Sequence, residues 1–125
     1  MTMFGYNVLG FGAIAGTVDA AGAFSATGGT VTAAGVDLVH TFTSSGTFSV
    51  PSGVSAVDVL VVGGGGAGGG DAGGGGGAGG LIYRPGFTVS PGGTVTVTVG
   101  NGGGSSSPNN PGQRGQDSVF GTLTA

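Results

Sequence analysis

Short stretches of alternating apolar and polar residues occupy much of the second half of the chain. The clearest is Thr94–Val99 (TVTVTV), whose valines would face a core and whose threonines would face solvent. Ala56–Val62 (AVDVLVV) is a mostly apolar strand, with Val57, Val59 and Val61 on one side. No segment has apolar residues at helical spacing. The pattern therefore predicts an all-β chain of short strands.

Turn residues separate these strands from their neighbours in the sequence. Leu38–Thr43 and Thr47–Val50 flank Ser44-Ser45-Gly46, which predicts a hairpin. Phe42 and Phe48 are its core candidates. Strands that recur about every 8–12 residues between turn signals are typical of a small antiparallel β-sandwich.

The chain after residue 80 repeats this pattern of strand and turn. Leu81–Tyr83 and Phe87–Val89 are expected to be strands on either side of a turn at Arg84-Pro85-Gly86. Asp117–Thr124 is expected to close the fold as one strand in which Gly121 marks a bulge. The core candidates of this last strand are Val119 and Leu123.

Between two of the predicted strands lies Gly63–Gly80, in which 14 of 18 residues are glycine. Glycine has no side chain to bury, and ordering each residue costs about 1–2 kcal/mol of backbone entropy. The tract is therefore either a flexible linker or a pair of extended helices of the polyproline-II type, with three residues per turn and backbones paired to their neighbours. Asp71-Ala72 divides it into two runs of eight residues, each about 25 Å long in that conformation.

Residues 1–37 form an arm rich in glycine, alanine and threonine, and residues 38–125 form the domain. The arm has no dense apolar cluster, although its first apolar residues alternate as in an extended strand. Either it is an anchor that docks on a larger assembly, or it is a terminal strand that packs against its own domain. The proposed anchoring residues are Phe4, Tyr6, Val8, Leu9 and Phe11.

Composition argues against several classes of partner, of binding site and of cellular location. Among 125 residues, 34 are glycine and only 6% are charged, with a net charge of −3. The absence of a basic patch argues against nucleic-acid binding. Without cysteine there are no disulfides or thiolate metal sites. No apolar run is long enough for a transmembrane helix, and the apolar N-terminus lacks the positive residues of a secretory signal, so neither membrane insertion nor export is expected.

The chain carries no arrangement typical of catalysis. Its one histidine, His40, lies on a predicted strand, where a packed or surface position is usual. Its aspartates lack the spacing of a carboxylate pair or a metal loop. The G-x-G-x-x-G strings in the glycine tract follow from composition and lack the helix and acidic residue of a dinucleotide site. We therefore expect no enzyme, no catalytic or metal site and no cofactor.

Two polar regions are candidates for surface contacts. The aromatic and cationic cluster Tyr83–Phe87 either presents a binding surface or uses Arg84 structurally, paired with Asp71 or with glycine carbonyls. Asn101–Gln116 is either a recognition loop or a plain surface loop. The candidate contact residues are Tyr83, Arg84, Asn101, Asn109, Asn110 and Arg114.

About two thirds of the chain resembles a glycine-rich domain of bacteriophage tail-tip and other virion-surface proteins. The resemblance implies a β-structured base with glycine tracts packed as polyglycine-II helices, and loops that contact host receptors. Phe4–Gly12 (FGYNVLGFG) also resembles the N-termini of small marine-phage virion proteins. The blocks that carry the main resemblance are His40–Pro51, Val57–Gly66, Gly79–Phe87, Thr94–Gly100 and Asp117–Ala125.

The resemblance leads us to expect a virion structural protein, a capsid decoration or head fibre, located on the surface of the capsid or tail. Its expected partners are the major capsid protein or another virion protein, and a host receptor or glycan. Because one chain buries little apolar area, we also expect a homotrimer or another homo-oligomer. The alternatives are a tail-fibre tip adhesin and, less consistent with the sequence, an ice-binding or secreted matrix protein.

Overall fold

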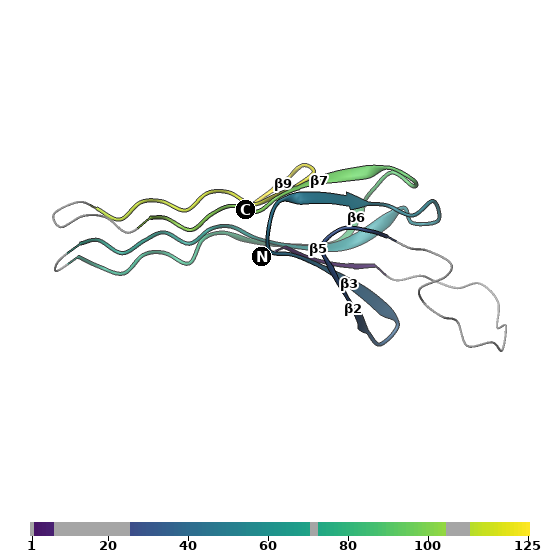
Figure 1. Cartoon of the computed structure of the whole chain (residues 1–125), viewed down its shortest axis with the longest axis horizontal. Coiled ribbons are helices and arrows are strands. Elements are labelled where there is room, and N and C mark those ends of the chain that lie inside the picture. The colour runs from purple at the N-terminus through teal and green to yellow at the C-terminus, as the bar shows by residue number, and fades with distance from the viewer. Residues whose placement is uncertain (1, 7–25, 71–72, 105–110) are drawn as a thin grey trace.

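The computed structural model describes residues 2–6, 26–70, 73–104 and 111–125. These residues form nine β-strands in two antiparallel sheets, and four extended segments project from one end of the sheets (Figure 1). The fold is all-β, as predicted. Nothing in the described part of the chain is a helix of sufficient length and apolarity to cross a bilayer.

Five strands form the first sheet: β1 (Thr2–Tyr6), β2 (Thr30–Ala34), β3 (Asp37–Phe42), β5 (Ala56–Val62) and β6 (Leu81–Thr88). Their order is β2-β3-β1-β5-β6, and all neighbours are antiparallel. The N-terminal strand therefore lies at the centre of the sheet, between β3 and β5. The backbones of Phe4 and Tyr6, at the start of the predicted arm, belong to this strand.

Four strands form the second sheet: β4 (Gly46–Ser49), β7 (Thr94–Thr98), β8 (Val119–Phe120) and β9 (Leu123–Thr124). They follow the order β4-β7-β8-β9. A bridge between Thr27 and Ser49 connects the segment before β2 to the second sheet.

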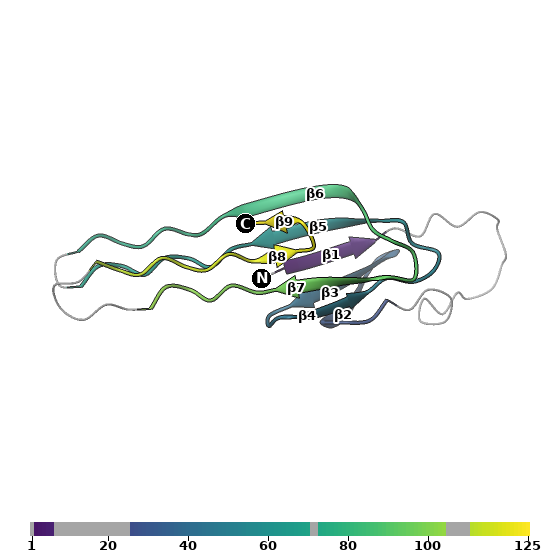
Figure 2. The ribbon, with the colours of Figure 1, turned by 90° about the horizontal axis from the view of Figure 1, so that it is seen from above.

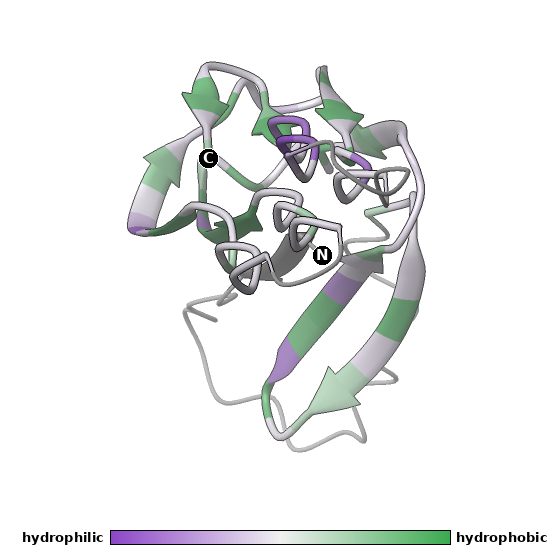
Figure 3. Cartoon of the chain, turned by 90° about the vertical axis from the view of Figure 1, so that its left-hand side faces the viewer, coloured by the Kyte–Doolittle hydropathy of each residue, from purple (hydrophilic) through white to green (hydrophobic). Residues whose placement is uncertain are grey.

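The core lies between the two sheets. Val57, Val59 and Val61 of β5 are buried, as their alternation predicted, and they face the buried Phe48 and Phe120 of the second sheet. The end view shows green apolar bands on the strands of both sheets (Figure 3). Burial of these side chains, each worth about 1.5–3 kcal/mol, is what holds the two sheets together.

The predicted hairpin between Leu38–Thr43 and Thr47–Val50 is wrong. Both strands exist and bury Phe42 and Phe48, but β3 pairs within the first sheet and β4 pairs with β7 in the second. The residues Ser44-Ser45-Gly46 therefore carry the chain across the sandwich. Each phenylalanine reaches the core from its own sheet, and that burial outweighs local pairing.

Two other predictions, a turn and a strand, also differ from the structure. Leu81–Thr88 is one strand, in which Arg84-Pro85-Gly86 forms a bulge and the Gly86 N–H donates to Asp58 Oδ1 at 2.8 Å. The expected single strand at Asp117–Thr124 is instead the short β8–β9 hairpin, whose turn places Gly121 at a φ of 57°. Phe120, rather than Val119 or Leu123, is the fully buried residue of this hairpin.

Four extended segments, called rods here, continue the strands beyond one end of the sandwich. The first rod (Gly63–Gly70) leaves β5, and the second rod (Gly73–Gly80) returns into β6. The third rod (Gly100–Gly104) follows β7, and the fourth rod (Pro111–Asp117) leads into β8. Seen from above, the second and third rods lie on opposite sides of the bundle (Figure 2).

Candidate functional site

The rods are held together by hydrogen bonds that repeat every three residues. Along the first two rods, Gly63 N–H donates to Gly80 at 2.8 Å, Gly66 to Gly77 at 2.8 Å and Gly69 to Gly74 at 3.0 Å. A repeat of three is that of a polyglycine-II helix, in which every third residue faces the same side. The described parts of the glycine tract are therefore a pair of packed helices.

The first rod has a different neighbour on each of its three sides. One side faces the second rod, and the next side faces the fourth rod. On that side the Gly64 N–H donates to the Gln116 carbonyl and the Ala67 N–H donates to the Gln113 carbonyl, both at 2.9 Å. The remaining side meets the third rod, where Gly103 N–H donates to the Gly65 carbonyl at 2.8 Å. The first rod is thus the centre of the bundle.

The third and fourth rods are paired with each other as well. Gln116 N–H donates to the Asn101 carbonyl at 2.8 Å, and the Asn101 side-chain amide donates to Gln116 Oε1 at 3.2 Å. At their base the Ser118 hydroxyl accepts from Gly100 N–H at 3.0 Å. Asn101–Gln116, expected to be a surface loop, therefore contributes two more rods to the bundle.

Backbones in this bundle approach too closely for side chains between them. A Cβ at Gly79 would lie 2.6 Å from the Gly63 carbonyl oxygen, and one at Gly115 would overlap the Gly64 carbonyl. Real Cβ atoms essentially never come within 3.0 Å of such an atom. Glycine at these positions therefore permits the hydrogen bonds that replace a hydrophobic core.

Polar side chains line one shallow groove of the bundle. The groove has a volume of about 370 Å³ and lies between the second and fourth rods, with the first rod at its floor and Ala125 at its base. Arg114 and Asp117 lie on the fourth-rod side, 3.8 Å apart, with 90% and 56% of their side chains exposed. An exposed pair of this kind adds little stability and leaves both charges available to a partner.

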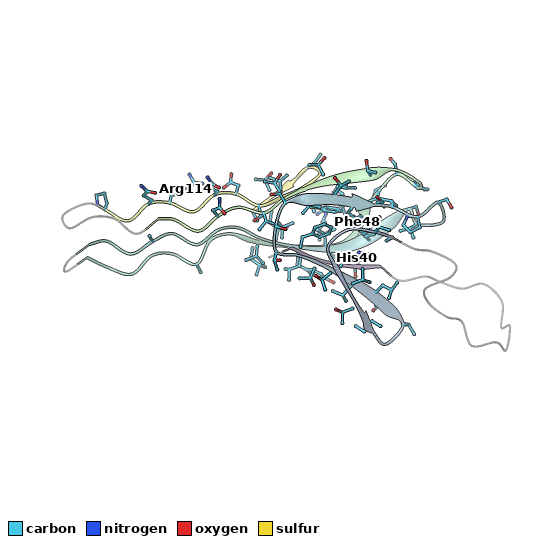
Figure 4. All side chains as sticks on the ribbon, in the orientation of Figure 1. His40, Phe48 and Arg114 are labelled. Atoms are coloured by element: carbon cyan, nitrogen blue, oxygen red, sulfur yellow. The ribbon has the colours of Figure 1, made fainter. Side chains whose placement is uncertain are left out.

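The predicted contact residues fall into two separate groups. Tyr83 and Arg84 are exposed on β6, on the sandwich, whereas Asn101 and Arg114 stand on the third and fourth rods. Figure 4 shows Arg114 on a rod, beyond the end of the sandwich. Asn109 and Asn110 lie outside the described residues, as does Asp71, the predicted partner of Arg84. The structure therefore does not gather the candidates into one site.

The predicted anchoring residues are also divided. Phe4 and Tyr6 belong to β1, whose backbone pairs with β3 and β5. Val8, Leu9 and Phe11 lie outside the described residues. Docking of this segment on a larger assembly thus stays a prediction, and its first residues already share a sheet with the domain.

His40 has a structural position. Its ring is fully buried, its Nδ1 lies 2.9 Å from the Gly28 carbonyl oxygen, and it meets Phe48 edge to face at 5.1 Å (Figure 4). Across the described residues, no three His, Cys, Asp or Glu side chains gather as a metal site would require. The candidate contact residues therefore lie on the surfaces of the rods and of the β6 edge.

The sequence contained a signal for the fourth rod that was missed. Gly112 and Gly115 are three residues apart, and both face the backbone of the first rod. The intervening Gln113 and Arg114 made the segment resemble an ordinary polar loop. A glycine at every third position, within reach of a glycine tract, is the pattern that would have revealed it.

A β-sandwich extended by a bundle of polyglycine helices defines the class of the chain as a glycine-rich β-protein. Residues 41–125 match the family model described as a glycine-rich domain, and the chain belongs to this family. No curated protein and no solved structure matches it significantly.

Proposed function

We propose that the chain is a non-enzymatic structural protein of a bacteriophage virion, of the capsid-decoration or head-fibre type. The sandwich would sit toward the particle and the rod bundle would project outward. The resemblance of five sequence blocks to virion-surface proteins of phages supports the phage assignment. The remainder of the proposal rests on the architecture of the bundle.

The single observation that carries the proposal is the backbone pairing of the rods. A glycine tract that hung free would be a flexible linker, whereas rods tied by hydrogen bonds every three residues form a stiff projection. In Figure 1 all four rods leave the sandwich at the same end. A stiff projection holds contact groups at a set distance from the surface that carries it.

The chemistry of the projection suits passive attachment. The polar side chains of Gln113, Arg114 and Gln116 fill the positions between and after the two glycines of the fourth rod, where they offer amide and guanidinium groups to a protein or glycan. Each such contact is weak, but many copies on one particle multiply their effect. The proposed partners are the major capsid protein or another virion protein on one side and a host receptor or glycan on the other.

Mass spectrometry of purified particles of a phage whose genome encodes the chain tests the proposal. We expect the chain at roughly hundreds of copies per particle, because a decoration repeats over the head, and cryo-electron microscopy should locate it there. A few copies at a fibre end would instead identify the tail-tip adhesin. Failure to find the chain in particles, although it is expressed in infected cells, would reject both virion roles.

A further inference from the structure

The second rod contains glycines that nothing in the described chain requires. A Cβ at Gly76 would overlap the Gly66 carbonyl, and one at Gly79 would lie 2.6 Å from that of Gly63. These residues face the first rod. In contrast, a Cβ added at Gly74, Gly75 or Gly77 would meet no atom within 4 Å.

The fourth rod shows what an outer rod of this bundle needs. It has glycine only where it faces the first rod, at Gly112 and Gly115, and every other position carries a side chain, most of them polar. The second rod contacts fewer rods than the fourth, yet it has more glycine. In the end view the fourth rod is coloured purple, whereas the glycine rods are pale (Figure 3).

The backbone N–H groups on the outer surface of the second rod also lack hydrogen-bond acceptors in the described chain. Within the described residues, the N–H groups of residues 74–79 donate to no acceptor, and residues 73–80 are all exposed. A rod with a free row of amides is the counterpart of an open edge strand, which pairs readily with another backbone. Side chains or proline usually blunt such edges, and the second rod has only the methyl group of Ala78.

The open edge continues from the rod into the sandwich. β6 is the outermost strand of the first sheet, and it exposes two large side chains next to the rod, Leu81 at 65% and Tyr83 at 60%. The edge is blunted only further along, where Pro85 and Gly86 form the bulge. One unpartnered surface therefore runs from Gly74 to Tyr83.

We propose that this surface is the centre of a homotrimer in which the second rods of three chains pack in parallel about a three-fold axis. A rod with three residues per turn has three sides, about 120° apart, and in a bundle of three rods one side of each rod faces the common axis. The side with Gly76 meets the first rod of the same chain. The carbonyls of Gly74 and Gly77 also bond to the first rod, whereas the side with Gly75 and Ala78 is open and would face the axis, where it meets the second rods of the other two copies.

The occupant follows from the space and the chemistry. Only a backbone without bulky side chains can come close enough to bond the free amides of residues 74–79, so the partner surface must itself be a glycine rod. The second rod leaves such a bare side open, whereas the fourth carries Gln113 and Arg114 outward. A parallel arrangement would also bring together the Leu81 and Tyr83 side chains of three chains and cover them.

This inference stands apart from the virion role, because it concerns only how copies of the chain associate. Native mass spectrometry and light scattering of the purified full chain test it. We expect a mass three times the 11.5 kDa of the chain. A monomer would overturn the proposal, and a dimer would overturn the three-fold arrangement.

Three substitutions locate the contact. Gly75→Gln adds a side chain where the single chain has open space, so we expect an unchanged circular dichroism spectrum and a threefold fall in mass. Arg114→Gln, on the exposed fourth rod, should leave the trimer intact. Gly76→Gln collides with the first rod and should lose hydrogen-exchange protection at Gly66, an effect absent in Gly75→Gln. A trimer that survived Gly75→Gln would reject this placement.

Cross-linking tests the same contact without breaking the trimer. The chain has no cysteine, and Ala78 lies on an open side of the second rod. Oxidation of Ala78→Cys should join two copies through a disulfide near the axis, whereas Arg114→Cys should remain uncross-linked. Cross-linking through position 114 and not through position 78 would contradict the proposal.

Discussion

At the scale of single residues, the fold depends on a few large side chains and on several positions where none fits. Phe48 packs against His40 at 5.1 Å between ring centroids and against Phe120 at 6.0 Å. Both phenylalanines are fully buried in a chain that has few large apolar residues. They are the two largest fully buried side chains among the described residues, so each contributes a large share of the core.

Phe48→Ala should lower the free energy of unfolding by about 3–5 kcal/mol, because it removes a buried ring and leaves a cavity. Urea denaturation followed by circular dichroism measures the change. Val36→Ala is the matched control, since Val36 is 87% exposed and its truncation should change stability by less than about 0.5 kcal/mol. Equal effects of the two substitutions would contradict the assignment of the core.

At the scale of elements, the strands and rods follow different periods. β5 alternates every two residues and buries its valines on one face, and the first rod, which continues it, turns to a new neighbour at each residue. The change occurs at Gly63, where the side chains end. The same stretch of backbone thus passes from a sheet stabilised by packed side chains to a bundle stabilised by backbone hydrogen bonds.

The period of three makes a specific deletion tolerable. Removing residues 67–69 together with 74–76 takes one turn from each of the first two rods and leaves Gly66 opposite Gly77, which already bond at 2.8 Å. We expect the remaining amides to keep their hydrogen-exchange protection. Removing residues 68–69 with 74–75 instead breaks the period and should abolish protection along both rods. Similar results for the two deletions would exclude the three-residue packing.

At the scale of the whole molecule, the rods unite segments that are distant in the sequence. The first rod follows β5, while the fourth precedes β8 in the other sheet, yet Gly64 donates to Gln116 and Ala67 to Gln113. The two sheets bring the bases of these rods together, and the rods then extend the contact beyond the sandwich. The bundle is therefore an outward continuation of the sandwich.

Gly115→Ala tests this long-range contact. The added Cβ collides with the Gly64 carbonyl, and we expect a loss of about 1–3 kcal/mol, as for other overpacked sites. The amides of Gly64 and Ala67 should exchange faster with solvent in nuclear magnetic resonance experiments. Gln113→Ala, two residues away with an exposed side chain, should leave both amides protected. Unchanged protection in Gly115→Ala would contradict the contact.

The strands could be predicted from local pattern, and their pairing could not. Thr94–Val99 and Ala56–Val62 were located to within a residue because alternation is a property of each segment alone. The hairpin at Ser44-Ser45-Gly46 was wrong because a short turn allows either a hairpin or a crossing between sheets. Only the burial of Phe42 and Phe48 from opposite sheets selects the crossing.

The candidate site shows the same limit. Composition identified the tract Gly63–Gly80 and permitted both a linker and paired helices, because glycine has no side chain that distinguishes them. Gly112 and Gly115 were not recognised as part of the same unit, since their role depends on a backbone about 50 residues earlier in the chain.

The sequence by itself determined that the chain is all-β, which residues alternate toward a core, and that one long segment has no side chains to pack. The tertiary structure alone decided which strands share a sheet, and that four glycine-containing segments lie side by side. The physical reason is that periodicity is encoded in neighbouring residues, whereas a glycine backbone gains its hydrogen-bond partners only when the sandwich brings distant segments within reach.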